Sequence, residues 1–315
     1  MLYVYGCFEH MGDTIAISID PDENGYIGRE CPECEGYFKI TPGTGLEGDV
    51  PCHCPYCGAE ASQDEYFTKE QIEYAKSVAL NQITGSLIKQ MKKMEVKSNP
   101  RDFISMSISV KGKPHPISYY REQKLEQEVE CENCTLRYSI FGVFGYCPDC
   151  GVHNSYQILI SNYSVVRKML AFAVEQEVEV SKKLIENALE DAVSAFDGFG
   201  RELVANYYSR HSLNNKKPFS FQNIIVAKDK LFKEFSVDIK NELGIDNFSR
   251  LSKLFQKRHL HSHKMGVMDD EYINKTGGNR SQLGKVAAIT IEEVEEILLH
   301  LSNIGEFLFK NINSR

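Results

Sequence analysis

The chain has 315 residues and a formal net charge of −8 at pH 7, and its 42% hydrophobic and 25% charged residues are typical of a globular protein of two or three domains. No apolar run of about 18 residues occurs, so no membrane span is expected. The first residues lack the basic and apolar regions of a signal peptide, so we expect a cytoplasmic protein. The negative charge argues against a general nucleic-acid coat protein but allows a local basic site.

Residues 1–67 are predicted to contain short strands followed by two Cys-x-x-Cys motifs. Alternation of apolar and polar residues over 14–19 favours a strand, and the sequence at 21–25 is typical of a turn. The two motifs consist of Cys31, Cys34, Cys54 and Cys57.

A helix over 68–95, within a connecting segment at 68–98, is predicted from apolar residues at helical spacing and from a capping box that begins at Thr68. Lysines cluster at its end, and we favour their interpretation as cations near a helix C-terminus on a solvated face over an RNA contact. Residues 99–161 repeat the N-terminal pattern, with an alternating strand at 103–110 and two further motifs. These motifs consist of Cys131, Cys134, Cys147 and Cys150.

Cysteine pairs of this spacing, in a chain without an export signal, indicate metal sites more than disulfides. Each pair of motifs supplies four thiolates, the ligand set of a tetrahedral zinc ion in a zinc ribbon. The sequence therefore predicts two structural Zn²⁺ ions per chain with the eight cysteines as ligands. It leaves open whether Cys52, which lies beside His53, or Cys54 completes the first site. Cys7 is expected to be a buried thiol, and the aromatic residues of the second ribbon are expected to pack around its metal.

Helical patterns dominate residues 162–315, which we predict to be an all-α bundle. Glycines are expected to end a long helix, polar side chains are expected to cap three later helices, and residues 270–288 are expected to form a loop. The expected boundaries are marked by Gly198, Gly200, Ser220, Asp246 and Thr290.

A basic segment late in the third helix of this bundle carries the candidate chemistry. Residues 249–264 contain five lysines or arginines and three histidines but no carboxylate. Arginine binds phosphate through paired hydrogen bonds and histidine transfers protons near neutral pH, so the segment indicates chemistry on a phosphodiester. Arg258 falls where the apolar stripe should continue, and a regular helix places it about 140° from His263. The two residues can serve one site only if the helix ends between them or a second copy supplies one of them.

Late in the third helix of this small bundle, an arginine is followed by a polar residue, three further residues and a histidine. This order resembles the HEPN superfamily (higher eukaryote and prokaryote nucleotide-binding domains), and the resemblance covers residues 165–315. Arg258, His259 and His263 occupy the positions of that family's arginine, polar residue and histidine. The resemblance implies a metal-independent endoribonuclease with a composite site in a homodimer of helical domains, or a binding module without catalysis. The expected fold class is multidomain, with β-rich zinc ribbons containing two four-cysteine sites, a joining helix and an all-α HEPN-like bundle.

The resemblance also implies roles for the residues of the motif. The 2′-OH of RNA would attack the adjacent phosphorus while His263 transfers the proton, Arg258 stabilises the developing charge and His259 orients one of them. No cofactor is expected for catalysis, tRNA is a candidate substrate, and a toxin or antiviral defence role is a candidate context. The zinc ribbons would recognise the substrate or bind a regulatory protein. Further substrate contacts are expected from Lys257, His261 and Lys264.

Four alternatives stay open on the sequence alone. A non-catalytic adaptor would use ribbons and bundle to bind RNA or proteins. The basic segment would also suit a helix C-terminus, where cations are favoured. A metal site of His259, His261 and His263 is disfavoured because alternate residues on a helix point in different directions. A DNA-binding regulator is disfavoured because glutamates flank the cysteine motifs.

Overall fold

Two compact units make up the chain, Met1–His153 and Asn154–Arg315, and each is described by itself. The boundary lies earlier than the predicted 161/162, because the second ribbon ends where His153 bridges Tyr146 and helix α2 (Ser155–Val174) begins soon after.

The computed structural model describes only part of the side chains near the N-terminus. For residues 2–7 and 14–16 it describes the backbone alone, so the thiol of Cys7 lies outside the described residues, as does most of the strand predicted at 103–110. The described ranges are 2–7, 14–95, 109–125, 127–213 and 215–313.

The first unit begins with a hairpin packed on a long helix. Strands β1 (Leu2–Cys7) and β2 (Thr14–Ile19) pair in antiparallel fashion, and α1 (Lys69–Lys93) lies against β2. The predicted capping box is confirmed, since the Gln71 backbone N–H donates to Thr68 Oγ1 over 3.1 Å and the Thr68 N–H donates to Gln71 Oε1 over 3.1 Å. The helix therefore begins at the residue that its sequence predicts.

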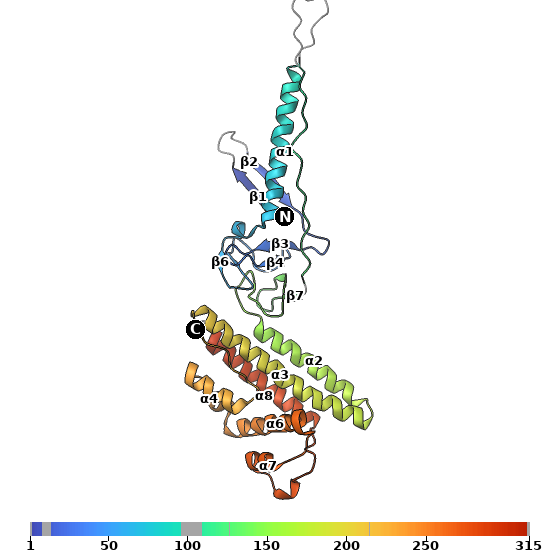
Figure 1. Cartoon of the computed structure of the whole chain (residues 1–315), viewed down its shortest axis with the longest axis vertical. Helices are drawn as coiled ribbons and strands as arrows, with labels where there is room; N and C mark the ends of the chain where they lie inside the picture. Colours follow the sequence, from blue (N-terminus) through green and yellow to red (C-terminus); the bar gives the residue numbers. More distant parts are fainter. Residues whose placement is uncertain (1, 8–13, 96–108, 126, 214, 314–315) are drawn as a thin grey trace, which may run out of the picture. The chain divides into compact units, whose positions relative to one another are not determined.

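An extended segment, residues 109–125, returns along α1 (Figure 1). Its backbone is held by helix side chains: the His115 N–H donates to Thr84 Oγ1 and the Ser118 N–H donates to Ser77 Oγ, both over 2.9 Å. These bonds place the residues that precede the second ribbon beside the first half of the unit.

The two ribbons share one four-stranded sheet of order β3-β4-β8-β7. The middle strands are antiparallel, with Ile40 opposite Tyr138. Every strand of the second ribbon in this sheet is displaced by 100 residues from its counterpart in the first, which confirms the ribbon part of the predicted internal repeat. The bounds are β3 Ile27–Glu30, β4 Tyr37–Ile40, β7 Gln127–Glu130 and β8 Arg137–Ile140.

Both ribbons also share one hydrophobic core. Phe38 and Tyr138, which are counterparts in the repeat, are fully buried in it. Tyr138 therefore packs as predicted, whereas Phe141 is 44% exposed at the hairpin tip, so only part of the aromatic cluster is core. The smaller elements of the unit are β5 Cys52–His53, β6 Glu60–Ala61 and the 3₁₀ helix Gln63–Tyr66.

Arg29 lies at the repeat position of Val129 and breaks the symmetry of the core. It is 0% exposed, and its Nε and Nη2 have no hydrogen-bond partner among the described residues. Its guanidinium carbon lies 5.1 Å from the centroid of the Phe67 ring. Burial lowers the pKa of Arg29, because the charged form loses its hydration. A buried charge with so few partners opposes folding.

Replacing Arg29 with methionine is expected to raise the free energy of unfolding by about 1–3 kcal/mol, because the unpaired charge disappears while an apolar chain still fills the space. Urea denaturation measures the change. The matched control is Arg137→Met at an exposed position of the same sheet, which should stay within about 0.5 kcal/mol of the unsubstituted protein. Destabilisation by Arg29→Met would show that the guanidinium has a partner in solution.

The second unit is all-α, as predicted. Three long helices, α2 (Ser155–Val174), α3 (Val178–Arg210) and α8 (Ile291–Asn313), lie side by side (Figure 1). Within the described part of the chain, no helix is both long and apolar enough to cross a membrane. The shorter helices are α4 Ile224–Phe235, α5 Ile239–Leu243, α6 Ile245–Lys264, α7 Asp270–Thr276 and the 3₁₀ helix Arg280–Gln282.

The prediction that Gly198 and Gly200 end a helix is wrong, since α3 continues through both to Arg210. A Cβ atom at Gly200 would lie 2.5 Å from a ring carbon of Phe221, so this glycine permits close packing of the 219–223 segment on α3. Tertiary packing, and not helix termination, accounts for the glycine.

Two predicted caps are also wrong. Asn223, and not Ser220, caps α4, because its Oδ1 accepts from the N–H groups of Ile225 and Val226, while Ser220 Oγ donates to Asp197. Asp246 lies inside the first turn of α6, whose N-cap is Gly244. The residues at 270–276, predicted as loop, form α7.

The cap predicted at Thr290 for the last helix is confirmed, and it is a capping box. The Thr290 N–H donates to Glu293 Oε2 over 3.1 Å, and the Glu293 N–H donates to Thr290 Oγ1 over 3.3 Å. The Lys257 side chain of α6 also donates a hydrogen bond to the Glu293 carboxylate, so this cap connects α8 to the basic segment.

Candidate metal centres and candidate catalytic site

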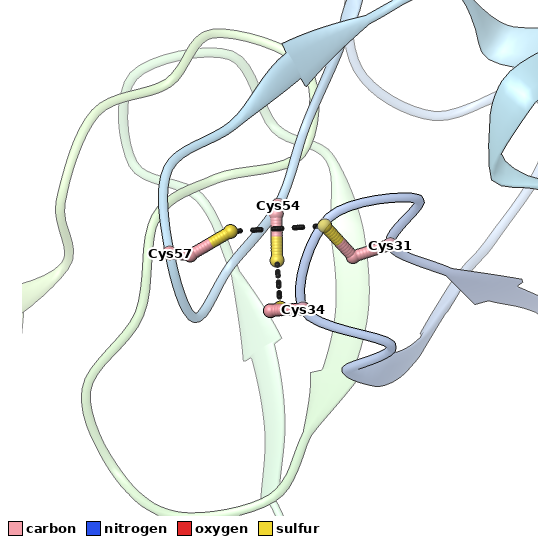
Figure 2. Close-up of side chains that lie close together, drawn as sticks. All are labelled: Cys31, Cys34, Cys54 and Cys57. Carbon is pink, nitrogen blue, oxygen red and sulfur yellow. Dashed lines mark hydrogen bonds between the residues drawn. The ribbon is translucent and has the colours of Figure 1, made fainter.

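The first four-cysteine cluster brings its sulfurs together as Figure 2 shows. The Sγ atoms of Cys31 and Cys57 are 3.7 Å apart, and those of Cys34 and Cys54 are 3.6 Å apart. A disulfide would require about 2.05 Å. A tetrahedron with metal–sulfur bonds of about 2.3 Å has edges of about 3.8 Å, so the cluster could hold one metal ion.

The second cluster repeats this geometry. Cys131 and Cys150 Sγ are 3.7 Å apart, and Cys134 and Cys147 Sγ are 3.5 Å apart. In each cluster all four ligand atoms lie within 4.8 Å of one another. The chain could therefore bind two metal ions, one per ribbon, through the eight predicted cysteines.

The first knuckle of each ribbon is built by the same backbone turn. The Glu35 N–H donates to the carbonyl of Cys31 over 3.0 Å, and at the repeat position the Thr135 N–H donates to that of Cys131 over 2.8 Å. Both donors adopt left-handed backbone angles, with φ of 55° and 63°. Such turns let N–H groups face the sulfurs, as the Tyr56 N–H in the second knuckle does toward Cys54 Sγ at 3.4 Å.

The structure decides the ambiguity at the first site in favour of Cys54. Cys52 is buried but lies outside the cluster, whereas the Cys54 thiol is one of its four ligand atoms. His53 instead contacts the other ribbon: its N–H donates to the Pro148 carbonyl over 2.7 Å, and its ring packs on Gly151. Cys52 and His53 thus belong to the shared core and to the junction between the ribbons.

Arg258 is buried on the core side of α6, as its place on the apolar stripe predicts. Its side chain is 7% exposed, and Nε lies 3.9 Å from Glu190 Oε1, a distance for charge attraction but not for a hydrogen bond. Nε has no hydrogen-bond partner among the described residues. A buried donor without an acceptor is uncommon in folded proteins, which marks Arg258 as a candidate site residue.

His259 and His263 are exposed on the other side of the helix, and their ring centroids lie 4.7 Å apart. The helix stays regular to Lys264 and ends with Met265 in a left-handed conformation. It therefore does not end between Arg258 and His263, and one of the two arrangements that would join them is excluded. Within one copy, the buried arginine and the exposed histidine pair lie on different faces.

Partial burial lowers the pKa of His259, and the nearby charges of His263 and Lys264 lower it further. Because the fold disfavours protonation, the unfolded chain binds this proton more readily. The folded protein therefore loses stability as the pH falls below about 6.5 and loses no more once the pH passes the lowered pKa. Above that window the group contributes no pH dependence.

An NMR titration of the histidine ring protons is expected to show a His259 pKa below 6.5. In the variant His263→Asn the pKa should rise, because one neighbouring cation is gone, yet stay below the ordinary value because the burial persists. His211→Asn, a change at the C-terminal end of α3, serves as the control and should leave the His259 titration unmoved. A His259 pKa above 6.5 would contradict the arrangement.

The three residues predicted as substrate contacts have partners within the chain. Lys257 pairs with Glu293, and Lys264 pairs with Asp269. The His261 side chain is 8% exposed: its Nε2 lies 2.6 Å from the Ala287 carbonyl oxygen and its Nδ1 lies 3.3 Å from a carboxylate oxygen of α3. The carboxylates come from α3, α8 and the turn before α7, which the local sequence around α6 does not reveal.

Two further residues join this site without having been predicted. Glu190 of α3 accepts a hydrogen bond from Ser262 Oγ and is also the carboxylate that pairs with the Arg258 guanidinium. Ser262 stands inside the histidine-rich stretch and could have been noticed there. Glu190 lies 68 positions before Arg258, and only the packing of α3 on α6 brings it into the site.

No protein family model, curated protein or solved structure matches this chain. The two metal centres and the α6 site are therefore the features of the molecule that indicate its function.

Proposed function

We propose that the protein is a metal-independent endoribonuclease of HEPN type that acts as a homodimer of its helical unit. The observation that carries the proposal is a buried arginine, with Nε unpartnered among the described residues, opposite an exposed histidine pair on one regular helix. One copy thus carries the arginine and the histidines on different faces of the helix. In a two-fold dimer, the arginine of one copy and the histidines of the other would form one site.

In the proposed reaction the RNA 2′-oxygen forms a bond to the adjacent phosphorus and the bond from phosphorus to the 5′-oxygen breaks. His263 accepts the proton of the 2′-OH, and Arg258 of the second copy stabilises the non-bridging oxygens as charge develops. His259 orients His263 or donates the proton that the 5′-oxygen needs. The products are a 2′,3′-cyclic phosphate and a free 5′-OH.

The test is incubation of the purified protein with tRNA and with total RNA in excess EDTA, followed by analysis of the product ends. Cyclic phosphate ends that appear despite the chelator support the proposal. RNA that stays intact over a wide range of protein concentration, with the protein dimeric, argues against it.

The metal in both ribbons is proposed to be zinc, because zinc is the metal that all-thiolate tetrahedral ribbons bind in a reducing compartment. We also propose that the protein is cytoplasmic, because cysteine thiols stay reduced in that compartment and remain available as metal ligands. Metal analysis of the purified protein should return two zinc ions per chain.

The proposed role of the ribbons is to recognise the RNA or a regulatory protein partner, and a toxin or antiviral defence context is part of the same proposal. The support is indirect: the ribbons lie in a unit of their own, apart from the helix that carries the candidate catalytic residues.

A second candidate function is a non-catalytic adaptor that binds RNA or protein. The observation that favours it is the neutralisation of the basic segment, because Lys257, Lys264 and Arg250 all have carboxylate partners. RNA binding that survives His263→Ala, without any cleavage by the unsubstituted protein, would identify the adaptor.

A further inference from the structure

The first unit contains a cleft of about 950 Å³, in the size range of small-ligand and side-chain sites. It is lined by segments that are distant in sequence: the turn at 20–24, Tyr74 of α1, most of residues 119–125 of the returning segment, and side chains of the shared sheet that include Lys39 and Glu128. None of the cysteines of either metal centre lines it.

Three tyrosines gather on one wall of this cleft. The Tyr74 ring lies 6.1 Å from that of Tyr119 and 5.8 Å from that of Tyr120, measured between centroids, at interplanar angles of 42° and 63°. Tyr119 is 80% exposed, although the neighbouring Ser118 N–H is anchored to Ser77 of α1. Large aromatic rings arranged at angles around an open space present their negative faces to a cation.

The charges around the tyrosines are predominantly negative. Five carboxylates and three cationic side chains line the cleft, which leaves a formal charge of 3 − 5 = −2. Lys39 is buried and pairs with Asp22 at 2.8 Å, so these two charges cancel, while the other two cations of the cleft, Arg121 and Lys124, are exposed. Among the remaining acidic residues, Asp20, Glu23 and Glu128 are exposed.

We propose that this cleft binds lysine or arginine side chains of a basic protein segment. A cationic side chain would lie against the Tyr74 and Tyr119 rings and form hydrogen bonds with carboxylates at the rim. The tyrosines could also stack on bases, but the net negative charge repels a phosphodiester, so charge complementarity favours a protein partner over RNA. The proposal is independent of the proposed ribonuclease activity.

The probe is a fluorescent peptide of repeated Arg-Gly, with Gln-Gly and Glu-Gly peptides of equal length as references, and the anisotropy of each peptide is measured as full-length protein is added. The Arg-Gly peptide should bind and the references should not. Tyr119→Ala, at an exposed position, should weaken binding about two- to fivefold, the loss expected for one exposed cation–π contact.

Charge controls separate this site from general attraction to an acidic protein. The double variant Asp20→Asn/Glu23→Gln removes two carboxylates of the cleft, whereas Glu47→Gln/Asp49→Asn removes two exposed carboxylates outside it. The first variant should weaken binding several-fold and the second should not. Three results would overturn the proposal. They are equal losses of peptide binding in both double variants, peptide binding that is unchanged by Tyr119→Ala, and binding of single-stranded RNA that requires Tyr119.

Discussion

Substitution of His263 by alanine is expected to lower the rate of EDTA-resistant RNA cleavage by about 10²–10⁴-fold, the usual contribution of a proton-transferring side chain. Its exposure means that the fold should survive the change. His211→Ala, which removes another exposed histidine of the same unit, is the matched control and should retain full activity. Cleavage by His263→Ala at the unsubstituted rate would remove this residue from the mechanism.

Arg258→Lys provides the second half of this test. Lysine keeps the charge but not the planar pair of donors, so the rate should fall by about 10²–10³-fold. Because Arg258 is buried, thermal unfolding of the variant must be compared with that of the unsubstituted protein. A loss of activity without a loss of fold assigns the effect to the guanidinium.

Mixing the two inactive variants tests whether the site is composite. A heterodimer of His263→Ala and Arg258→Lys copies would contain one site in which both the arginine and the histidine are native. Partial recovery of cleavage after mixing and reassociation is therefore expected. Absence of recovery, with heterodimers present by mass spectrometry, would rule out a site shared between copies.

Replacing Cys54 with serine is expected to remove one of the two metal ions and to unfold the first ribbon. Apparent binding free energies of structural zinc are about 10–16 kcal/mol, far more than a ribbon of this size gains from its small core. Cys52→Ser is the matched control: this buried thiol lies only two residues away but outside the cluster, so both metal ions should remain. Metal analysis and far-ultraviolet circular dichroism measure the two effects.

The shared sheet leads to a further expected result for the second ribbon. Because β4 pairs with β8 and the ribbons have one core, loss of the first metal should also lower the thermal stability of the second ribbon. Cys131→Ser should destabilise the first ribbon in the same way. Two independent melting transitions, each sensitive to one metal alone, would contradict the common core.

Local chemistry explains which predictions succeeded. The cysteine spacing predicted both clusters, because a knuckle needs only a short turn whose backbone turns back on its own sulfurs. The caps at Thr68 and Thr290 were predicted correctly for the same reason, since donor and acceptor lie three residues apart. The prediction that Gly200 ends a helix was wrong because this glycine makes room for the Phe221 ring, a neighbour that the periodicity of α3 does not reveal.

The amino-acid sequence by itself determined the two four-cysteine motifs, the all-α second unit and the position of Arg258 on a buried stripe, because each follows from the spacing of residue types along the chain. Only the tertiary structure decided that Cys54 and not Cys52 joins the first cluster, that Lys257 and His261 are engaged within the chain, and that Glu190 faces Arg258. Those outcomes depend on which distant carboxylates, carbonyls and sulfurs folding brings within a few ångströms, because hydrogen bonds and close ion pairs form only at such distances.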